Sequence, residues 1–476
     1  MPLRSALALV VVLWAAIFLP ALGSLEIKGE EGRRILPAVT MLESGNWIVP
    51  QVGSEPYFRK PPLVNWLVGA SFKLFGARNE WTARVPSAIC VLLVALAFVT
   101  VARSVLGENG SVVAALAWLT NFGMVEKGRL IEIEALYASL TGLAFICWCA
   151  WFLRGRSRWL TWIVPWIFLG LGLLAKGPLH LLFFYGVVSA VLYRRRELSR
   201  LLNFPHLIGI AVMLGIFATW AIPCLEIMHQ GNVAHTWSRQ FSGRLSGDGF
   251  RFAGWIQNIP RGLGYFLPWL LLIPVAGKVE FVDEVERRTV RGLGWGILGS
   301  FLFVCLLPGS LSRYSMPLLA PACWYLAMLL CAERLDLPNR FRLRWPAKFP
   351  PPLRLPVLLA SIVALAMWIY AIGIVPRLQQ RQKVRTIAAK IDAALPAGAT
   401  LYAVDPDYQP FLFYLRSPII YRSDIASLPA GAQYVLVQPE NETALAQSKQ
   451  WAPRAPKAIV RMTDYRARSV ILFAIQ

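Results

Sequence analysis

Long apolar blocks, separated by short polar segments, restrict most strongly what this chain can fold into. Each block is roughly 17–25 residues long, the length of helix that crosses a hydrocarbon core about 30 Å thick. Such blocks must be helical, because a bilayer offers no water to backbone polar groups. The pattern therefore predicts an α-helical polytopic membrane protein with about 11–13 transmembrane helices. The placed spans are 5–24, 84–105, 110–126, 134–153, 159–175, 178–194, 206–226, 262–277, 292–308, 315–332 and 355–375.

The basic residues between the blocks set the orientation. The net charge of +22 would suggest nucleic acid in a soluble chain. Here the Lys and Arg residues concentrate in four loops on one side, which the positive-inside rule makes cytoplasmic, so no nucleic-acid partner is expected. An odd number of spans then places the C-terminal region outside. The loops contain Arg154, Arg156 and Arg158; Arg194, Arg195, Arg196 and Arg200; Lys278, Arg287, Arg288 and Arg291; and Arg340, Arg342, Arg344, Lys348 and Arg354.

The first apolar block, residues 6–22, has two interpretations. One Arg precedes it, and Ala21-Leu22-Gly23-Ser24 weakly resembles the cleavage site of a signal peptide. We favour an uncleaved first span, because the polar loop that carries the candidate chemistry follows it at once.

Three polar segments are expected on the outer side. A long loop at residues 25–83 contains two interfacial helices, at about 33–43 and 63–75. In the second loop, 228–261, His229 and His235 are six residues apart, which does not suit a ligand pair on one helical face. The chain therefore divides into a transmembrane domain at 1–375, with these two loops, and a small α/β domain at 376–476. Its expected elements are helices at 379–394 and 440–450 and strands at 400–404, 419–421, 434–438, 458–461 and 469–474.

Two acidic clusters are expected at the same membrane face. Glu30 and Glu31 lie within the segment 29–34, just after the first span. Acids in the first turn of a helix are also favoured by the helix dipole, which is the plainer explanation for this pair. A second cluster includes Glu132 and Glu134, which on a helix face opposite ways, so that only one points into a shared cavity. Carboxylates beside a bilayer are costly, so we expect the two clusters to form one site.

Several cations are expected at the same depth as the acids. Lys176-Gly177-Pro178 interrupts a long apolar run, and a Lys at such a helix break can point its ammonium at an anion. Snorkelling explains any single cation near a membrane surface. A group on the outer face runs against the positive-inside tendency and suits a phosphate or diphosphate headgroup. Its members are Lys60, Arg84, Arg129, Lys176 and Arg313.

Several short segments match the pattern of a known family. In the first loop they are Glu30-Glu31-Gly32-Arg33, Leu42-Glu43-Ser44-Gly45-Asn46-Trp47 and Pro56 to Leu63. Further matches are Phe75-Gly76, Glu80, Arg84-x-Pro86, Glu134 after Arg129, Leu174 to Pro178 and, more weakly, Arg313-Tyr314-x-x-Pro317. With these segments the chain resembles the bacterial lipid A 4-amino-4-deoxy-L-arabinose transferases, which are relatives of the protein O-mannosyltransferases in the GT-C superfamily.

The resemblance implies a GT-C fold in the bacterial inner membrane, with the active site and the C-terminal domain periplasmic. It implies an inverting glycosyltransferase that takes a sugar from a polyprenyl-phosphate carrier. The acceptor would be lipid A, another envelope glycolipid or glycan, or protein, and the partners would include membrane lipids.

The resemblance also assigns roles to single residues. Glu30 takes the place of the family's essential first-loop acid, as general base or for electrostatics, with Glu31 and Glu134 as further catalytic acids. The residues expected to bind the substrate or its phosphate are Arg33, Tyr57, Lys60, Arg84, Arg129, Lys176, Arg313 and Tyr314.

Three positions depart from the family pattern. Glu30 and Glu134 stand where the family usually has Asp. Arg59 stands where some relatives have an acid that helps to bind a divalent metal. The resemblance therefore leaves the sugar and a metal open, and it implies no other cofactor.

A transporter or flippase of lipid-linked sugars is the alternative to an enzyme. Transporters place ionisable residues near the bilayer midplane and carry internal repeats. In this chain the charges gather at the outer ends of spans and no repeat is visible. The pattern therefore favours the enzyme.

Overall fold

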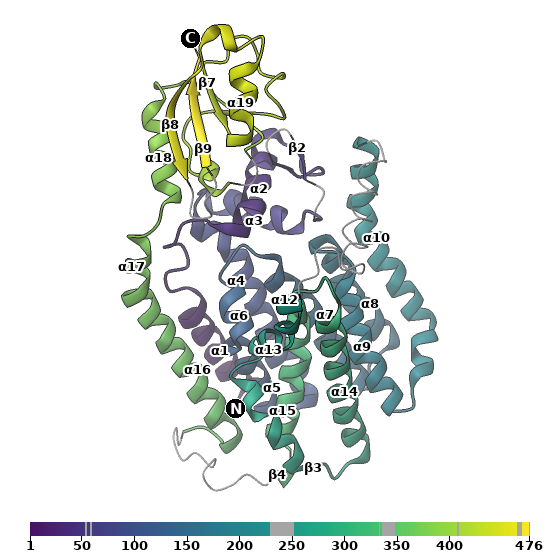
Figure 1. Cartoon of the computed structure of the whole chain (residues 1–476). Coiled ribbons are helices and arrows are strands. Elements are labelled where there is room, and N and C mark those ends of the chain that lie inside the picture. Colours follow the sequence, from purple (N-terminus) through teal and green to yellow (C-terminus); the bar gives the residue numbers. More distant parts are fainter. Residues whose placement is uncertain are drawn as a thin grey trace. The chain divides into compact units, whose positions relative to one another are not determined.

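The computed structural model describes the chain apart from residues 53–54, 58–59, 229–251, 333, 336–347, 407–408, 464–468 and 476. The predictions for Arg59, for His229 and His235, and for Arg340, Arg342 and Arg344 lie outside the described residues. The chain divides into two compact units (Figure 1). Unit 1 comprises Met1–Pro20, Arg59–Val64 and Val85–Ala371, and unit 2 comprises Ala21–Phe58, Asn65–Arg84 and Ile372–Gln476. Unit 2 thus combines most of the first polar loop with the C-terminal region.

Unit 1 is built from apolar helices at the predicted places. Among the described residues, six helical segments are long and apolar enough to cross a membrane, and three apolar helices are shorter. One segment, Glu80–Thr120, supplies two predicted spans, because Gly107 at φ +71° interrupts it. The helices are α1 (Leu3–Phe18), α4 (Glu80–Ala97), α5 (Arg103–Thr120), α7 (Ile133–Leu153), α8 (Arg158–Ala175), α9 (Leu179–Arg194), α10 (Phe204–Ile227), α14 (Glu284–Leu306), α15 (Leu319–Leu330) and α16 (Pro351–Ile369).

The predicted span at 262–277 differs from the structure. Its place is taken by the short helix α13 (Asn258–Gly264) and the 3₁₀ helix η4 (Trp269–Lys278). Pro268 and Pro274 have no N–H to donate, and glycine is a poor helix former, so a continuous α-helix is not stable in this stretch. Apolar length alone does not reveal these interruptions.

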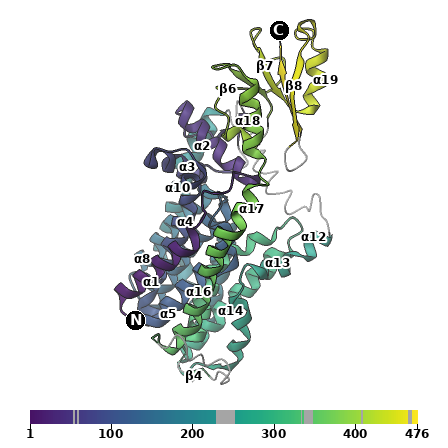
Figure 2. The ribbon, with the colours of Figure 1, turned by 90° about the vertical axis from the view of Figure 1, so that its left-hand side faces the viewer.

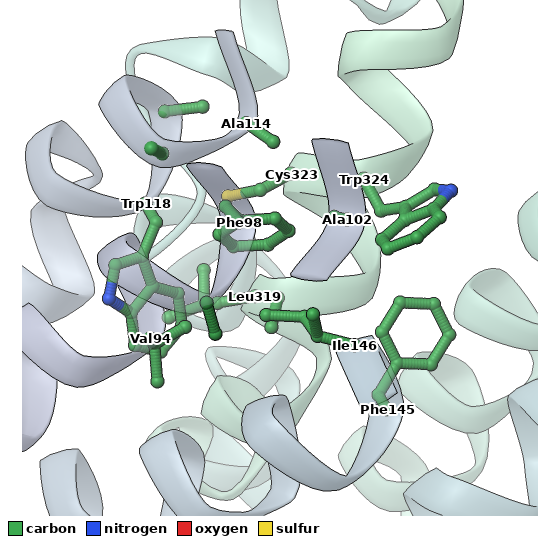
Figure 3. Packing of buried hydrophobic residues seen from close by; sticks show 14 of the residues in the cluster. Val94, Phe98, Ala102, Ala114, Trp118, Phe145, Ile146, Leu319, Cys323 and Trp324 are labelled. Carbon is green, nitrogen blue, oxygen red and sulfur yellow. The ribbon is translucent and has the colours of Figure 1, made fainter. Parts of the chain in front are cut away.

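The centre of unit 1 is packed with aromatic and small side chains (Figure 3). Phe98 and Trp118, from the segment Glu80–Thr120, are fully buried and belong with Cys323 of α15 to one apolar cluster. The rings of Phe145 in α7 and Trp324 in α15 meet edge to face, with centroids 5.8 Å apart. Lipid chains are as apolar as these side chains, so close packing holds membrane helices together more than hydrophobicity does.

Helix α1 packs against α5 and α16, the last helix of unit 1 (Figure 2). The indole of Trp14 in α1 donates a hydrogen bond to the carbonyl of Ala88 in α4 over 2.8 Å. The first and last parts of unit 1 are therefore neighbours.

Two glycines let α14 approach the backbone of α9 closely. A Cβ on Gly292 would lie 2.7 Å from Cα of Val191, and a Cβ on Gly296 would lie 2.7 Å from Cα of Val187. Such spacing of small residues is a common device of membrane helix pairs.

The substitution Gly296→Leu is therefore expected to destabilise unit 1 by about 1–3 kcal/mol or more, because the backbone of α9 cannot yield as a flexible side chain can. Gly299→Leu on the same helix is the matched control, since among the described residues no atom beyond its own stretch of helix lies within 4 Å of the added Cβ. Thermal unfolding of both variants in detergent measures the difference. Equal melting temperatures would contradict the close contact.

Unit 2 contains the helices and strands expected of the polar segments. The first loop forms α2 (Gly32–Ser44) and α3 (Leu63–Phe75), close to the predicted bounds, and unit 2 contains α2 and most of α3. The C-terminal region forms a five-stranded sheet in the order β6-β5-β7-β9-β8 (Figure 1). Strands β6, β5 and β7 are parallel, and β9 is antiparallel to β7 and β8. The bounds are β5 (Leu401–Val404), β6 (Ile419–Arg422), β7 (Tyr434–Val437), β8 (Lys457–Thr463), β9 (Ser469–Ala474), α17 (Val375–Gln379), α18 (Val384–Ala394) and α19 (Pro439–Gln447).

The core of the sheet follows from its sequence. Val404, Val435 and Phe473 point from neighbouring strands into one apolar cluster, which Leu445 of α19 and Trp451 complete. The predicted small C-terminal α/β fold is therefore confirmed.

Candidate functional site

The two acids of the first cluster have different environments. They lie in the 3₁₀ turn η1 (Gly29–Glu31), which Gly29 enters at φ +60°, a conformation that favours glycine. The side chain of Glu30 is 33% exposed, and Nη1 of Arg33 lies 3.2 Å from both of its oxygens. Glu31 is 2% exposed. Glu30 is therefore the accessible carboxylate of the pair.

Arg84 holds Glu31 inside unit 2. Its Nε and Nη2 donate to the two carboxylate oxygens of Glu31, each over 2.8 Å. The remaining N–H groups donate to the carbonyls of Leu22, Leu25 and Glu26. A guanidinium has five N–H donors, so none is left for another ligand. The geometry thus gives Arg84 a structural role, and its predicted phosphate contact stays a prediction.

Tyr57, a predicted substrate contact, meets Arg34, which was not among the predicted site residues, inside unit 2. Nη1 of Arg34 donates to the hydroxyl of Tyr57 over 2.8 Å, and Tyr57 is buried. The backbone N–H of Tyr57 donates to the carbonyl of Pro50 over 2.7 Å. These contacts fix the second part of the first loop against α2. The predicted substrate contacts of Tyr57 and Arg33 stay predictions.

The second acidic cluster forms a buried ionic group in unit 1. Glu134 lies in the first turn of α7, and its Oε1 is 3.3 Å from Nζ of Lys176 and 3.0 Å from Nε of Arg313. The ammonium of Lys176 also lies 4.4 Å from the ring centre of Tyr314, a cation–π contact. The structure therefore brings together Glu134, Lys176, Arg313 and Tyr314, all predicted site residues from three separate parts of the chain.

Tyr137 and His180, which the sequence analysis did not single out, hold the helix break that positions Lys176. Gly177 takes φ +110°, which a side chain rarely tolerates. The hydroxyl of Tyr137 donates to the carbonyl of Gly177 over 2.8 Å and accepts from the backbone N–H of His180 over 2.5 Å. Tyr137 lies three residues after Glu134, on the same helix face, so this spacing was a signal available in the sequence.

The expectation that only one of Glu132 and Glu134 serves a shared site stays a prediction, but its premise changes. Glu132 does not lie on the helix: it precedes α7 as its N-cap residue, at φ −114° and ψ 150°. Burial raises the pKa of Glu132, the ammonium of Lys127, 3.1 Å away, lowers it, and the carboxylate of Glu134 raises it. Glu132 thus pairs with Lys127, whereas Glu134 pairs with Lys176 and Arg313. Burial lowers the pKa of Lys127, but Glu132 and Glu126 raise it by more.

Arg129 and Lys60 are the two remaining cations that the sequence predicted for the site. The two Nη atoms of Arg129 donate to the carbonyls of Ile17, over 2.7 Å, and of Pro20. A helix leaves its last carbonyls without intrahelical partners, so Arg129 stabilises the end of α1. Lys60 is half-buried in unit 1. The predicted phosphate contacts of both residues stay predictions.

The predicted acids occupy both units. Glu30 and Glu31 belong to unit 2, whereas Glu134 belongs to unit 1. Their union in one site remains a prediction. In the part of the chain that the structure describes, no group of three or more His, Cys, Asp or Glu side chains is placed to ligate a metal. No step is therefore assigned to a metal.

A cavity of about 780 Å³ lies in unit 1 among α13, η4, α14 and α15. Most of its wall is apolar, including Phe266, Trp269 and Phe301, while Asn121, Arg287 and Arg291 add polar groups. Its lining includes none of the predicted site residues. An apolar cavity of this kind suits a hydrocarbon chain.

Known proteins resemble this chain in sequence. The family model described as dolichyl-phosphate-mannose-protein mannosyltransferase matches residues 59–222. An undecaprenyl phosphate-alpha-4-amino-4-deoxy-L-arabinose arabinosyl transferase of Proteus mirabilis is 28% identical over 64% of this chain and 54% of its own length. A protein of the same name from Pseudomonas savastanoi pv. phaseolicola is 29% identical over 63% of this chain and 56% of its own length. The chain thus spans just over half the length of these curated relatives.

A solved structure resembles the chain over almost its whole length. The crystal structure of ArnT from Cupriavidus metallidurans bound to undecaprenyl phosphate superposes with a TM-score of 0.72 at 18% identity. The match covers 98% of this chain and 97% of that chain. The apo form of the same protein gives a TM-score of 0.69. The predicted resemblance to the arabinosyl transferases is therefore confirmed, the chain has the fold of this solved structure, and it is a multi-pass membrane protein.

Proposed function

We propose that this chain is an inverting glycosyltransferase that takes a sugar from a polyprenyl-phosphate carrier. The acceptor is lipid A, another envelope glycolipid or glycan, or a protein. Transfer takes place on the periplasmic side of the bacterial inner membrane, where the positive-inside rule puts the first loop. The relatives named as arabinosyl transferases from undecaprenyl phosphate support the donor class.

The observation that carries this proposal is the buried ionic group around Glu134. Glu134 and Lys176 lie where α7 begins and where α8 ends, and their side chains are 10% and 7% exposed. Charges buried beside a membrane are costly and are retained for function. Lysine and arginine side chains fixed in this way are suited to the phosphate of a lipid carrier, and a chain with this fold provides helices to hold its lipid tail.

The chemistry requires one bond to form and one to break. The acceptor oxygen bonds to the anomeric carbon of the sugar while the bond from that carbon to the carrier phosphate breaks, and the carrier phosphate leaves with the electron pair. Glu30 takes the proton when the acceptor is a hydroxyl, or positions the acceptor when it is an ionised phosphate. Lys176 and Arg313 stabilise the charge that develops on the leaving phosphate.

The apolar cavity between η4 and α14 supports a lipid-linked substrate. Its volume of about 780 Å³ and its apolar wall suit part of a hydrocarbon chain. We assign it to lipid in general, since its lining does not distinguish a prenyl chain from an acyl chain.

The direct test supplies the purified full chain, in lipid nanodiscs, with synthetic polyprenyl-phosphate sugars and candidate acceptors. Mass spectrometry of lipid A, surface glycans and envelope proteins, from cells with and without the chain, identifies the product. The proposal predicts one glycoform that depends on the chain. If no glycoform changes and a folded chain transfers no sugar, the proposal is wrong.

Replacing Lys176 by Met is expected to lower the turnover number about a hundredfold, because the variant lacks one fixed positive charge that stabilises the leaving phosphate. Lys449→Met is the matched control, since Lys449 is exposed on the C-terminal region. Steady-state rates of both variants, with a melting curve for each, make the measurement. If a folded Lys176→Met variant has the same turnover number as the control, Lys176 takes no part in the reaction.

A further inference from the structure

Glu26, a buried residue between the first span and the acid pair, caps a helix from the far end of the chain. Its carboxylate accepts hydrogen bonds from the backbone N–H groups of Lys383 (3.1 Å), Val384 (3.0 Å) and Arg385 (3.1 Å). These amides begin α18, where a helix has no acceptors of its own. A carboxylate is favoured there by the helix dipole as well as by the hydrogen bonds. Glu26 therefore joins the first loop to the C-terminal region inside unit 2.

A second contact lies one residue further along the first loop. The hydroxyl of Tyr414 accepts from the backbone N–H of Ile27 over 2.6 Å and donates to Oε1 of Glu80 over 2.7 Å. Burial raises the pKa of Tyr414, so its hydroxyl stays protonated and able to donate. The same carboxylate oxygen of Glu80 pairs with Arg385, the residue whose N–H group Glu26 holds. The two contacts are thus parts of one network.

This network reaches the acid pair through α4. Glu80 and Arg84 are four residues apart on that helix and so share a face. Arg84 binds the carboxylate of Glu31 and the carbonyls of Leu22, Leu25 and Glu26. The segment 22–31 is therefore held by Arg84 through its carbonyls and by the C-terminal region through Glu26 and Ile27.

We propose that Glu26, Glu80 and Tyr414 form a clasp by which the C-terminal region positions the loop that carries Glu30. They are positioning residues, since they act on the reaction through the path of the segment 22–31. The inference rests on the proposed function, in which Glu30 acts on the acceptor. It assigns the C-terminal α/β region a part in the reaction: the region fixes the path of the acidic loop.

The clasp predicts a particular kinetic effect. A displacement of about 1 Å at a reacting group can cost a hundredfold in rate, while binding of the donor elsewhere is unaffected. Loosening the clasp is therefore expected to lower the turnover number and leave the KM for the donor nearly unchanged. A residue that serves only folding would instead lower the amount of folded protein and leave the turnover number per folded molecule unchanged.

The test uses the full chain with Glu26→Gln or Tyr414→Phe, and Glu442→Gln as the control. Glu442 pairs with Arg461 on the same C-terminal region, and that pair is exposed. Hydrogen exchange of the amides of residues 27–31 is measured together with the rate of transfer from a polyprenyl-phosphate sugar. We expect faster exchange in this segment, unchanged exchange in α7, and a turnover number at least tenfold lower in both variants, with the control unchanged. Glu26→Asp is expected to restore part of the rate.

Several outcomes would overturn the clasp. If the amides of residues 27–31 exchange in both variants as slowly as in the wild-type chain, the contacts do not hold the loop. Faster exchange with an unchanged turnover number would show that the loop needs no positioning, and faster exchange through the whole C-terminal sheet would reduce Glu26 to a folding role. If the wild-type chain transfers no sugar from any donor, the proposed function fails, and with it the kinetic part of the inference, while the exchange measurements still decide whether the clasp exists.

Discussion

Replacing Glu30 by Gln is expected to lower the rate of sugar transfer by about 10²–10⁴-fold when the acceptor is a hydroxyl, because general base catalysis contributes that much. The chain should remain folded, since the side chain of Glu30 is 33% exposed and its pairing with Arg33 is of the kind that contributes about 0–1 kcal/mol. Steady-state transfer in nanodiscs and a melting curve measure the two effects separately.

The control for this substitution is Glu43→Gln in the same unit. Glu43 pairs with Arg78 and is well exposed. The substitution Glu43→Gln makes the same change of charge as Glu30→Gln, and Glu43 lies outside the acid pair. Full transfer activity in a folded Glu30→Gln chain would remove Glu30 from the reaction and leave the first-loop resemblance without a catalytic meaning.

Replacing Arg84 by Met is expected to destabilise unit 2 by about 3–5 kcal/mol, because it removes the guanidinium that holds both carboxylate oxygens of the buried Glu31. The pair is nearly inaccessible, with side chains 3% and 2% exposed. Thermal unfolding of the purified chain, followed by the fluorescence of its tryptophans, measures the loss.

Two comparisons sharpen this prediction. Arg78→Met breaks an exposed pair and is expected to cost about 1 kcal/mol or less. The double substitution Glu31→Leu with Arg84→Met removes both charges and should recover much of the stability lost in the single variant. A stable Arg84→Met chain with weakened donor binding would instead restore the phosphate contact that the sequence predicted for Arg84.

Local sequence patterns were sufficient for most of the elements. The structure has a helix at Leu63–Phe75, as predicted, and α7 begins within one residue of its predicted start. The strands of the C-terminal region lie within a few residues of their predicted bounds. These elements depend on hydrophobic periodicity and length, which neighbouring residues provide by themselves. The predicted span at 262–277 was wrong, because the length of an apolar stretch does not show where a helix is interrupted.

For the candidate site, local patterns identify the charged residues but do not predict their partners. The sequence identified Glu134, Lys176 and Arg313 as chemistry-bearing residues, and the structure places Lys176 and Arg313 within ion-pair distance of Glu134. It also pointed to Arg84, whose donors are all taken up by partners within the protein. An arginine that satisfies all five donors inside the protein looks the same in a sequence as one that binds a phosphate.

By itself the sequence determined a polytopic helical membrane protein, a small C-terminal α/β fold, and a short list of acids and cations as candidates for the site. It could do so because transmembrane length, strand alternation and helix-breaking residues are local properties. Only the tertiary structure decided which of these charges satisfy one another. Glu26 caps a helix 358 residues away, and Tyr414 meets an amide 387 residues away. Such pairings follow from how the units fold in space, because a hydrogen bond requires atoms about 3 Å apart whatever their separation along the chain.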